Sequence, residues 1–330
     1  MLRRLGGAVL AVAGLRLFRK VVLAGRRLPV EAASQNLAGR VVIVTGASDG
    51  LGKATAKILA AMDAEIVFAC RNAGRAQAAI EETLRYAPSI RREQLRFIPM
   101  DLADLGSVRA FAEQFRAAYA RLDVLINNAG VGTTGVKGTQ GVTRDGVEAV
   151  FQVNHLGHFY LTRLLQDMIV QCNGRVVNMS SFGHRLCADP TCFDEVQRAR
   201  PGARNGYWLY GRSKLANILF TRELQQRLTA EFPQFKGDVF AVNPGRVYTS
   251  VWSKSYSQAP ALFFALVGWL TMKTPLEGAT TSVFCAVSPA LQGRGGAYLS
   301  NCAISNPSPL AKDDALALAL WEKSEQLLGF

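Results

Sequence analysis

The sequence has few of the residues that build metal sites and disulfide frameworks. Only three histidines occur among 330 residues, and the six cysteines include no Cys-x-x-Cys pair. Cysteines scattered in this way are typical of buried, reduced thiols rather than of a zinc site or a disulfide scaffold. We therefore expect no metal. Internal repeats, low-complexity tracts and long Pro- or Ser-rich linkers are also missing, which indicates one large folded unit.

Acidic residues are missing from the first thirty positions of the chain. Seven of the 13 net positive charges precede Glu31, so the rest of the chain carries a net charge of only +6. Binding of nucleic acid would need a concentrated basic patch, with aromatic side chains among the basic ones where single strands bind. We therefore expect no nucleic acid among the partners.

The amino-terminal segment also lacks an apolar run that could cross a bilayer unaided, because residues 5–15 form a run of only eleven. On a helix, the basic residues at positions 16, 19, 20, 26 and 27 fall on one side and apolar residues fall on the other. Such a helix is typical of a segment that binds an anionic membrane surface. An Arg-rich, acid-free helix is also typical of a mitochondrial transit peptide.

We accordingly expect residues 1–36 to be a membrane anchor or targeting segment, with residues 1–28 in contact with the membrane surface. Basic residues after the apolar run favour a cytosolic position for the domain that follows. The endoplasmic reticulum is the expected membrane, and import into mitochondria is the alternative.

From residue 37 onward, short β-rich runs alternate with helical patterns. Strands that are apolar on both faces and separated by helices predict a doubly wound parallel sheet of the Rossmann type, in a single α/β domain over residues 37–330. The expected strands are 41–45, 65–69, 95–99, 124–127, 175–179, 239–243 and 297–299. The expected helices are 51–61, 75–86, 107–119, 145–171, 210–229, 275–287 and 313–327.

A glycine-rich turn joins the first expected strand to the first expected helix, and reads Thr45-Gly-Ala-Ser-Asp-Gly-Leu-Gly52. Its glycines allow the backbone to approach a pyrophosphate, which binds at the amino end of a helix. Asp49 places a carboxylate inside the turn, which would weaken the affinity for a cofactor. A glycine turn without a ligand is the alternative. The residues expected to bind the cofactor here are Thr45, Gly46, Ser48, Gly50, Leu51 and Gly52.

The end of the second expected strand indicates which dinucleotide binds. Cys70 occupies the position where a carboxylate would hold the ribose 2′-hydroxyl of NAD, and Arg71 follows it. A guanidinium suits a 2′-phosphate, so NADP(H) is favoured over NAD(H); a solvated loop arginine is the alternative. Asp101, after the third strand, is expected either to accept a hydrogen bond from the adenine amino group or to cap the next helix.

Two further turns follow expected strands at the carboxyl edge of the sheet, where such folds bind ligands. The first is Asn127-Asn-Ala-Gly130, in which Asn128 is expected to contact the cofactor. The second is Asn243-Pro-Gly-Arg-Val-Tyr-Thr249, whose carbonyl groups and terminal threonine could hold the nicotinamide amide. The residues expected to bind there are Pro244, Gly245, Val247 and Thr249.

Tyr210 and Lys214 lie four residues apart and therefore on one face of an expected helix. A neighbouring ammonium favours the phenolate and would lower the pKa of the phenol, which makes Tyr210 a candidate proton donor or acceptor. Ser181 ends a strand from which it can reach a substrate oxygen. Asn154 lies inside an expected long helix, where a side chain that competes for backbone hydrogen bonds indicates a special role. His155 and His158 are expected to be packing residues.

Taken in order, these motifs resemble the short-chain dehydrogenase/reductase family from residue 37 to the carboxyl terminus. The stretches 151–159, 213–220 and 306–309 are similar to its retinol-dehydrogenase-like branch. The interval between the serine pair and Tyr210 exceeds the common family spacing, which implies an inserted loop over the active site.

That resemblance implies a catalytic tetrad of Asn154, Ser181, Tyr210 and Lys214. Tyr210 would exchange the proton and Ser181 would orient the substrate oxygen. Lys214 would bind the nicotinamide ribose and lower the pKa of the tyrosine, while Asn154 would hold a water in a proton relay.

The stretch 260–270 is apolar nearly all round and would form either a buried helix or a lid over an apolar substrate. Together with the membrane-seeking amino terminus, it predicts a lipophilic alcohol, aldehyde or ketone of the retinoid, steroid or polyprenol class. The alternative is a catalytically weak scaffold or signalling protein that retains the dehydrogenase fold. Whether two copies of the chain form a homodimer is left open.

Overall fold

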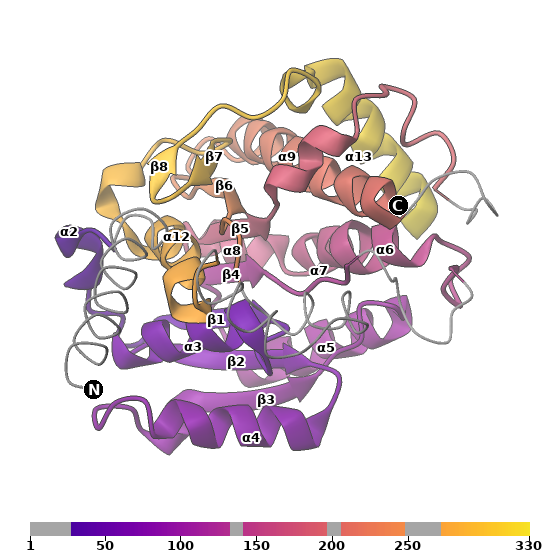
Figure 1. Ribbon diagram of the computed structural model, residues 1–330. Helices are drawn as coiled ribbons and strands as arrows, with labels where there is room; N and C mark the ends of the chain where they lie inside the picture. The colour runs from indigo at the N-terminus through magenta and orange to yellow at the C-terminus, as the bar shows by residue number, and fades with distance from the viewer. Residues whose placement is uncertain (1–27, 133–140, 197–205, 248–271) are drawn as a thin grey trace, which may run out of the picture.

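An eight-stranded sheet forms the centre of the computed structural model, which describes residues 28–132, 141–196, 206–247 and 272–330. The strand order is β3-β2-β1-β4-β5-β6-β7-β8, and it can be followed in Figure 1 from β3 near the bottom to β7 and β8 near the top. All neighbouring strands are parallel except β7 and β8. The strands are β1 Val41–Thr45, β2 Glu65–Cys70, β3 Leu95–Pro99, β4 Val124–Asn127, β5 Arg175–Met179, β6 Val239–Asn243, β7 Tyr298–Ser300 and β8 Ala303–Ile304.

Helices cover both faces of the sheet because its inner strands are apolar on both sides. In β1, Val42 and Val44 belong to one buried cluster, whereas Val41 and Ile43 belong to another. The first cluster is completed by α3 (Gly50–Ala61), α4 (Ala73–Leu84) and α12 (Pro275–Val287). The second is completed by α5 (Leu105–Ala118), α7 (Gly157–Leu164), α8 (Gln166–Gln171), α9 (Gly206–Glu231) and α13 (Asp314–Leu328).

The predicted doubly wound α/β fold is therefore confirmed. Five of the seven expected strands have the predicted bounds, β2 runs one residue further, and β7 begins one residue later. The antiparallel strand β8 was not predicted, because a strand of two residues carries no alternation that a sequence pattern could reveal.

The helix expected over residues 145–171 is confirmed from residue 149 onward, but it is not one regular helix. The chain forms α6 (Ala149–Phe151), a π-helical turn η3 (Gln152–Leu156) and α7 without a gap, and α8 follows after a break at residue 165. The carboxylate of Glu148 starts this series by accepting hydrogen bonds from the backbone N–H groups of Val150 and Phe151. A π-helical turn widens the backbone by one residue and is common at functional sites.

Several expected features lie outside the described residues, namely most of the amino-terminal segment, the stretch 260–270 and Thr249. The described part of the chain contains no helix long and apolar enough to cross a membrane. The short helix α2 (Val30–Ala33) contacts α12, and its Ala32 is fully buried in the core. This turn at the end of the expected targeting segment thus packs on the folded domain.

Candidate active site

The candidate residues gather at one edge of the sheet, where four neighbouring parallel strands end. β1 ends at Thr45, β4 at Asn127, β5 at Met179 and β6 at Asn243. Because all four run in the same direction, the turns that follow them meet at the carboxyl edge of the sheet (Figure 1).

The glycine-rich turn between β1 and α3 is held against the turn after β4. Gly46 has a φ of +67°, a conformation that L side chains rarely adopt. A Cβ at position 52 would lie 2.5 Å from both the Gly46 carbonyl oxygen and Asn128 Nδ2, so only glycine fits there. Asn128 Nδ2 donates to the carbonyl oxygen of Thr45 at 2.8 Å. The backbone of this turn therefore presents the amino end of α3, where a pyrophosphate would bind.

Thr45 connects the glycine-rich turn to the π-helical turn. Its Oγ1 accepts hydrogen bonds from the backbone N–H groups of Asn128 and Ala129, so its own proton is donated to His158 Nε2 at 2.9 Å. His158 then carries its proton on Nδ1 and donates it to the carbonyl oxygen of Asn154 at 3.2 Å. Burial lowers the pKa of His158 to about 3, which keeps the ring neutral. The expectation that His158 only packs was therefore incomplete.

Two arginines lie close to the end of β2, where the adenosine ribose of a dinucleotide would bind. Arg71 is exposed and its Nη1 lies 3.8 Å from Asp101 Oδ2. Arg75, in the first turn of α4, pairs with Asp49 through an Nη2–Oδ2 distance of 2.8 Å. Burial raises the pKa of the Cys70 thiol to about 11, so no negative charge arises at that position.

Sequence reasoning missed Arg75, although its place four residues after Arg71 was a signal that both could face one site. Asp49, which was expected to disturb the turn, has two defined contacts. It caps α3 by accepting from the Gly50 N–H at 2.7 Å, and it holds the guanidinium of Arg75. The carboxylate of Asp49 thus helps to hold the Arg75 guanidinium where the 2′-phosphate of a cofactor is expected.

The expected helix cap at Asp101 is wrong. Helix α5 begins at Leu105, and its capping residue is Asp104, which accepts from the Ser107 N–H at 3.3 Å. Asp101 lies too far upstream to cap this helix, and its Oδ1 instead accepts from the Ala103 N–H at 3.0 Å. The predicted contact with adenine stays a prediction.

Ser181 and Tyr210 lie side by side at the carboxyl end of β5. Ser181 caps the 3-10 turn η4 (Phe182–Leu186) by accepting from the Gly183 N–H at 3.2 Å, and its side chain lowers the pKa of the neighbouring Tyr210 phenol. A Cβ at position 183 would lie 3.2 Å from Tyr210 Cε1 and 3.6 Å from Ser181 Oγ, so glycine there lets the turn pack on the ring. Ser181 and Tyr210 thus both border Gly183, where the two hydroxyl groups could act on one substrate oxygen.

Lys214 is buried, and its Nζ donates to the carbonyl oxygen of Met179 at 3.0 Å. The ammonium lies 5.4 Å from the centroid of the Tyr210 ring. Burial lowers the pKa of Lys214 to about 8. Burial also raises the pKa of Tyr210 above its usual value, and the Ser181 side chain opposes this only in part. The lowered pKa expected for Tyr210 is therefore not found, because burial disfavours its phenolate. The separate contribution of Lys214 to that pKa stays a prediction.

Asn154 lies in η3 and ties three segments together. Its side chain makes a reciprocal pair with the backbone of Val131, at 2.8 Å and 3.0 Å, and donates to Ser213 Oγ at 2.9 Å. Its carbonyl oxygen accepts from Asn217 Nδ2 at 3.0 Å and from His158. These contacts give Asn154 a positioning role between the turn after β4 and helix α9, and its expected role in holding a water stays a prediction.

The turn after β6 approaches a lysine that sequence reasoning missed. Val247 forms an isolated bridge with Lys273, and a Cβ on Gly245 would lie 3.4 Å from Lys273 Nζ. Lys273 is buried and donates to Asn301 Oδ1. Pro244, Gly245 and Val247 thus belong to the same edge of the sheet as the other candidate residues.

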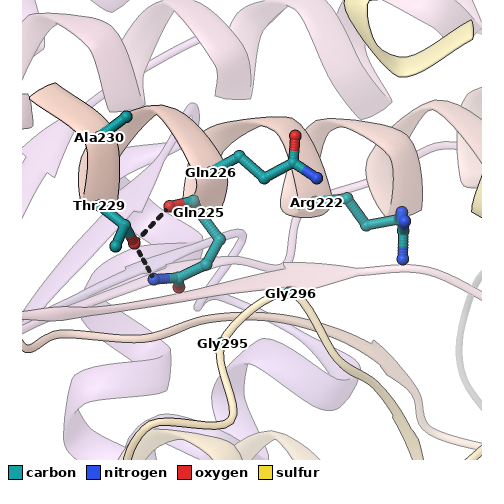
Figure 2. Close-up of a pocket in the computed structure, with 7 residues that line it drawn as sticks. All are labelled: Arg222, Gln225, Gln226, Thr229, Ala230, Gly295 and Gly296. Atoms are coloured by element: carbon teal, nitrogen blue, oxygen red, sulfur yellow. Dashed lines mark hydrogen bonds between the residues drawn. The ribbon is translucent and has the colours of Figure 1, made fainter. Parts of the chain in front are cut away.

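A pocket of about 490 Å³ opens along the carboxyl-terminal half of α9, away from the candidate active-site residues (Figure 2). Arg222, the lining residue closest in sequence to Tyr210, comes twelve positions later, or about 18 Å along the helix axis. The pocket is lined mainly by polar side chains, including Gln225, which donates to Thr229 Oγ1. It is therefore separate from the candidate active site. The described residues contain no group of three or more side chains that could hold a metal ion.

Known proteins with similar sequences extend over nearly the whole chain. The short chain dehydrogenase family pattern matches residues 40–186. The WW domain-containing oxidoreductase of Homo sapiens is 38% identical over 299 residues, which cover 89% of this chain and 69% of that protein. Retinol dehydrogenase 14 of Homo sapiens is 38% identical over 305 residues, which cover 88% of this chain and 87% of that protein. The resemblance predicted from the motifs is confirmed.

Solved structures agree with this relationship. An uncharacterized protein from Mycobacterium paratuberculosis has a TM-score of 0.67 and 32% identity, with 90% of this chain and 97% of that chain covered. A Beutenbergia cavernae protein described as an NAD(P)-dependent gluconate 5-dehydrogenase, with NADP bound at low occupancy, has a TM-score of 0.59 and 26% identity. That comparison covers 81% of this chain and 96% of the other.

The buried ammonium of Lys214 should lower the stability of the folded protein at neutral pH. Because its pKa falls from 10.5 to about 8 on folding, the folded protein binds fewer protons between these values, and the free energy of unfolding rises with pH across that window. We expect Lys214→Met to raise the free energy of unfolding at pH 7 by about 1–3 kcal/mol. The gain should shrink towards zero as the pH approaches about 10.

Urea titrations of the parent and the variant at both pH values measure this difference. Lys236→Met, which replaces an exposed lysine, is the matched control and should change little at either pH. A Lys214→Met variant that is less stable than the parent at pH 7 would contradict the assignment of a costly buried charge.

Proposed function

Because this chain belongs to the short-chain dehydrogenase/reductase family, we propose that it is an oxidoreductase that uses NADP(H) to interconvert a lipophilic alcohol and its aldehyde or ketone. The observation that carries the proposal is the placement of Ser181 and Tyr210 side by side at Gly183, next to the buried Lys214. This group lies at the same edge of the sheet as a glycine-rich turn suited to a pyrophosphate.

In the direction of reduction, Tyr210 donates a proton to the carbonyl oxygen of the substrate while Ser181 hydrogen-bonds to the same oxygen. A nicotinamide cofactor held by the glycine-rich turn would supply the hydride for the carbonyl carbon. The raised pKa of Tyr210 keeps its proton in place at neutral pH until the substrate binds. Once that proton has moved, the nearby ammonium of Lys214 stabilises the phenolate that remains.

The choice of NADP(H) over NAD(H) is supported by the two arginines beside the end of β2. Arg71 lies near Asp101 and Arg75 pairs with Asp49, and these ion pairs support contact of both guanidinium groups with the ribose end of the cofactor. A 2′-phosphate offers these groups charge-assisted hydrogen bonds that a 2′-hydroxyl cannot match. The bound NADP in the Beutenbergia cavernae relative agrees with this choice.

An apolar substrate is supported by exposed apolar side chains that lie close in sequence to Ser181 and Tyr210. Phe182 is 67% exposed, Leu186 is 54% exposed and Tyr207 is 48% exposed. Large apolar side chains exposed near a polar site favour an apolar ligand. The name of the relative retinol dehydrogenase 14 agrees with such a substrate class.

A membrane location would suit a lipophilic substrate. The basic amphipathic pattern of residues 1–28 supports attachment to a membrane surface, with the endoplasmic reticulum as the proposed membrane. Fractionation of cells, with sequencing of the mature amino terminus, tests this part of the proposal. A processed protein in the mitochondrial matrix would contradict it.

The full chain should bind NADPH at least about tenfold more tightly than NADH, because only NADPH can pair with the arginines. Arg71→Ala and Arg75→Ala should each weaken NADPH binding about tenfold and leave NADH binding within about twofold of the parent. Titration calorimetry with both cofactors measures this. Arg85→Ala is the control, because Arg85 is exposed at the opposite end of α4. Equal affinities of the parent for the two cofactors would refute the preference.

Tyr210→Phe should reduce turnover by about 10²–10⁴-fold while NADPH binding stays within about twofold of the parent. The variant keeps the ring but loses the hydroxyl that moves the proton. The assay follows NADPH oxidation with a lipophilic carbonyl selected from a screen of retinoid, steroid and polyprenol aldehydes and ketones. Tyr86→Phe, which changes an exposed tyrosine just beyond the end of α4, is the control. Turnover of Tyr210→Phe close to that of the parent would contradict the assignment of Tyr210 as the group that moves the proton.

A further inference from the structure

Two of the six cysteines meet in the segment between Ser181 and helix α9. Cys187 follows the last residue of η4, and Cys192 comes five positions later. Both side chains are buried, with 1% and 3% of their surface exposed, and both belong to the same cluster of contacting residues. Each thiol shifts the pKa of the other, so the two side chains are neighbours. The pair therefore lies together in the folded protein.

The backbone between the two cysteines forms an exposed loop. The Cys187 N–H donates to the carbonyl oxygen of His184 at 3.3 Å, and the Cys192 N–H donates to that of Asp189 at 3.2 Å. Asp189 Oδ1 accepts from both the N–H and the hydroxyl of Thr191, at 3.0 Å and 2.7 Å. Most residues between the cysteines are exposed, so a small opening of this loop brings the buried thiols into contact with solvent.

The surroundings make the two thiols chemically unequal. The hydrogen bond from Cys192 lowers the pKa of Cys187, and the guanidinium of Arg212 adds to this effect. The pKa of Cys192 is raised, first by the same hydrogen bond and then by burial. Arg212 is fixed in place, because it donates to the Cys192 carbonyl oxygen at 3.3 Å and pairs with Glu148 at 3.0 Å. Cys187 is therefore the better nucleophile, and Cys192 is suited to resolve its oxidised form.

We propose that Cys187 and Cys192 are a redox modification site, at which a peroxide or a low-molecular-weight disulfide closes a reversible intramolecular disulfide. With hydrogen peroxide, the Cys187 thiolate attacks one peroxide oxygen, forms a sulfenic acid and releases hydroxide. The Cys192 thiol then attacks the sulfenic sulfur and water leaves. With oxidised glutathione, Cys187 forms a mixed disulfide and releases one glutathione, and Cys192 displaces the second. Either route removes two hydrogen atoms, which are two protons and two electrons, from the protein.

The disulfide would stabilise the turn that carries Ser181. An S–S bond is about 2.05 Å long, so the two neighbouring sulfurs must come closer as the exposed loop between them adjusts. The bond would fix the end of η4, whose first residue is capped by Ser181. Gly211 packs against this turn, since a Cβ there would lie 2.8 Å from the Gly183 carbonyl oxygen. This inference stands on the cysteine pair itself and does not depend on the proposed substrate or cofactor.

Peptide mapping by mass spectrometry tests the site in the full chain after treatment with hydrogen peroxide or oxidised glutathione. We expect a Cys187–Cys192 cross-linked peptide, two hydrogen atoms lighter, that dithiothreitol converts back. Cys192→Ser should stop at the first step, as a sulfenic acid that dimedone traps at Cys187 or as a glutathione adduct there. Cys187→Ser should leave Cys192 unmodified. Cys285→Ser, at a fully buried cysteine outside the pair, should leave the cross-link unchanged.

Hydrogen exchange over residues 181–192 should slow by about threefold or more in the oxidised protein, because the bond closes the loop whose opening permits exchange. The proposal is overturned if the parent keeps both thiols reduced under conditions that oxidise the half-buried Cys172. A cross-link to a different cysteine, or modification of Cys192 in the Cys187→Ser variant, would also overturn it. The first of these tests, whether both thiols stay reduced, uses the parent protein alone. It therefore decides the proposal even if a variant fails to fold.

Discussion

The hydrogen bonds of Asn154 hold together the segments that form the site. Its side chain pairs with the backbone of Val131 and reaches Ser213, while its carbonyl oxygen accepts from Asn217 and from His158. This arrangement requires the π-helical turn η3, because a regular helix would direct that carbonyl group into the next turn. One asparagine thus links the turn after β4, helix α9 and, through His158, the glycine-rich turn.

Burial gives the site its chemistry and lowers its stability at the same time. The low pKa of Lys214 and the high pKa of Tyr210 both arise because neither charge is well solvated. A phenol that keeps its proton beside an ammonium that can stabilise the resulting phenolate suits reduction of a carbonyl group. Burying Lys214 costs stability at neutral pH, and the packing of the sheet between two apolar clusters offsets that cost.

Most strands and the order of the motifs could be predicted because they depend on local patterns. A buried parallel strand is a continuous apolar run, and a glycine-rich turn is visible wherever the backbone must approach a ligand. The missed features depend on contacts between distant segments. Three examples are the helix start capped by Glu148, the ion pair of Arg75 with Asp49 and the contact of Lys214 with Met179. In each of them, the fold brings together a backbone or side-chain partner that the sequence pattern does not show. The raised pKa of Tyr210 likewise follows from burial, which no spacing of residues reveals.

The central claim is that this chain moves a hydride between a nicotinamide cofactor and a lipophilic carbonyl. The most direct measurement incubates the full chain with NADPH deuterated at nicotinamide C4 and with a lipophilic aldehyde such as retinaldehyde, and then analyses the product by mass spectrometry. The account predicts an alcohol that carries one deuterium on its carbinol carbon when the label is on the transferred face of the ring. Absence of labelled alcohol across retinoid, steroid and polyprenol carbonyls, with either face of the cofactor labelled, would contradict it.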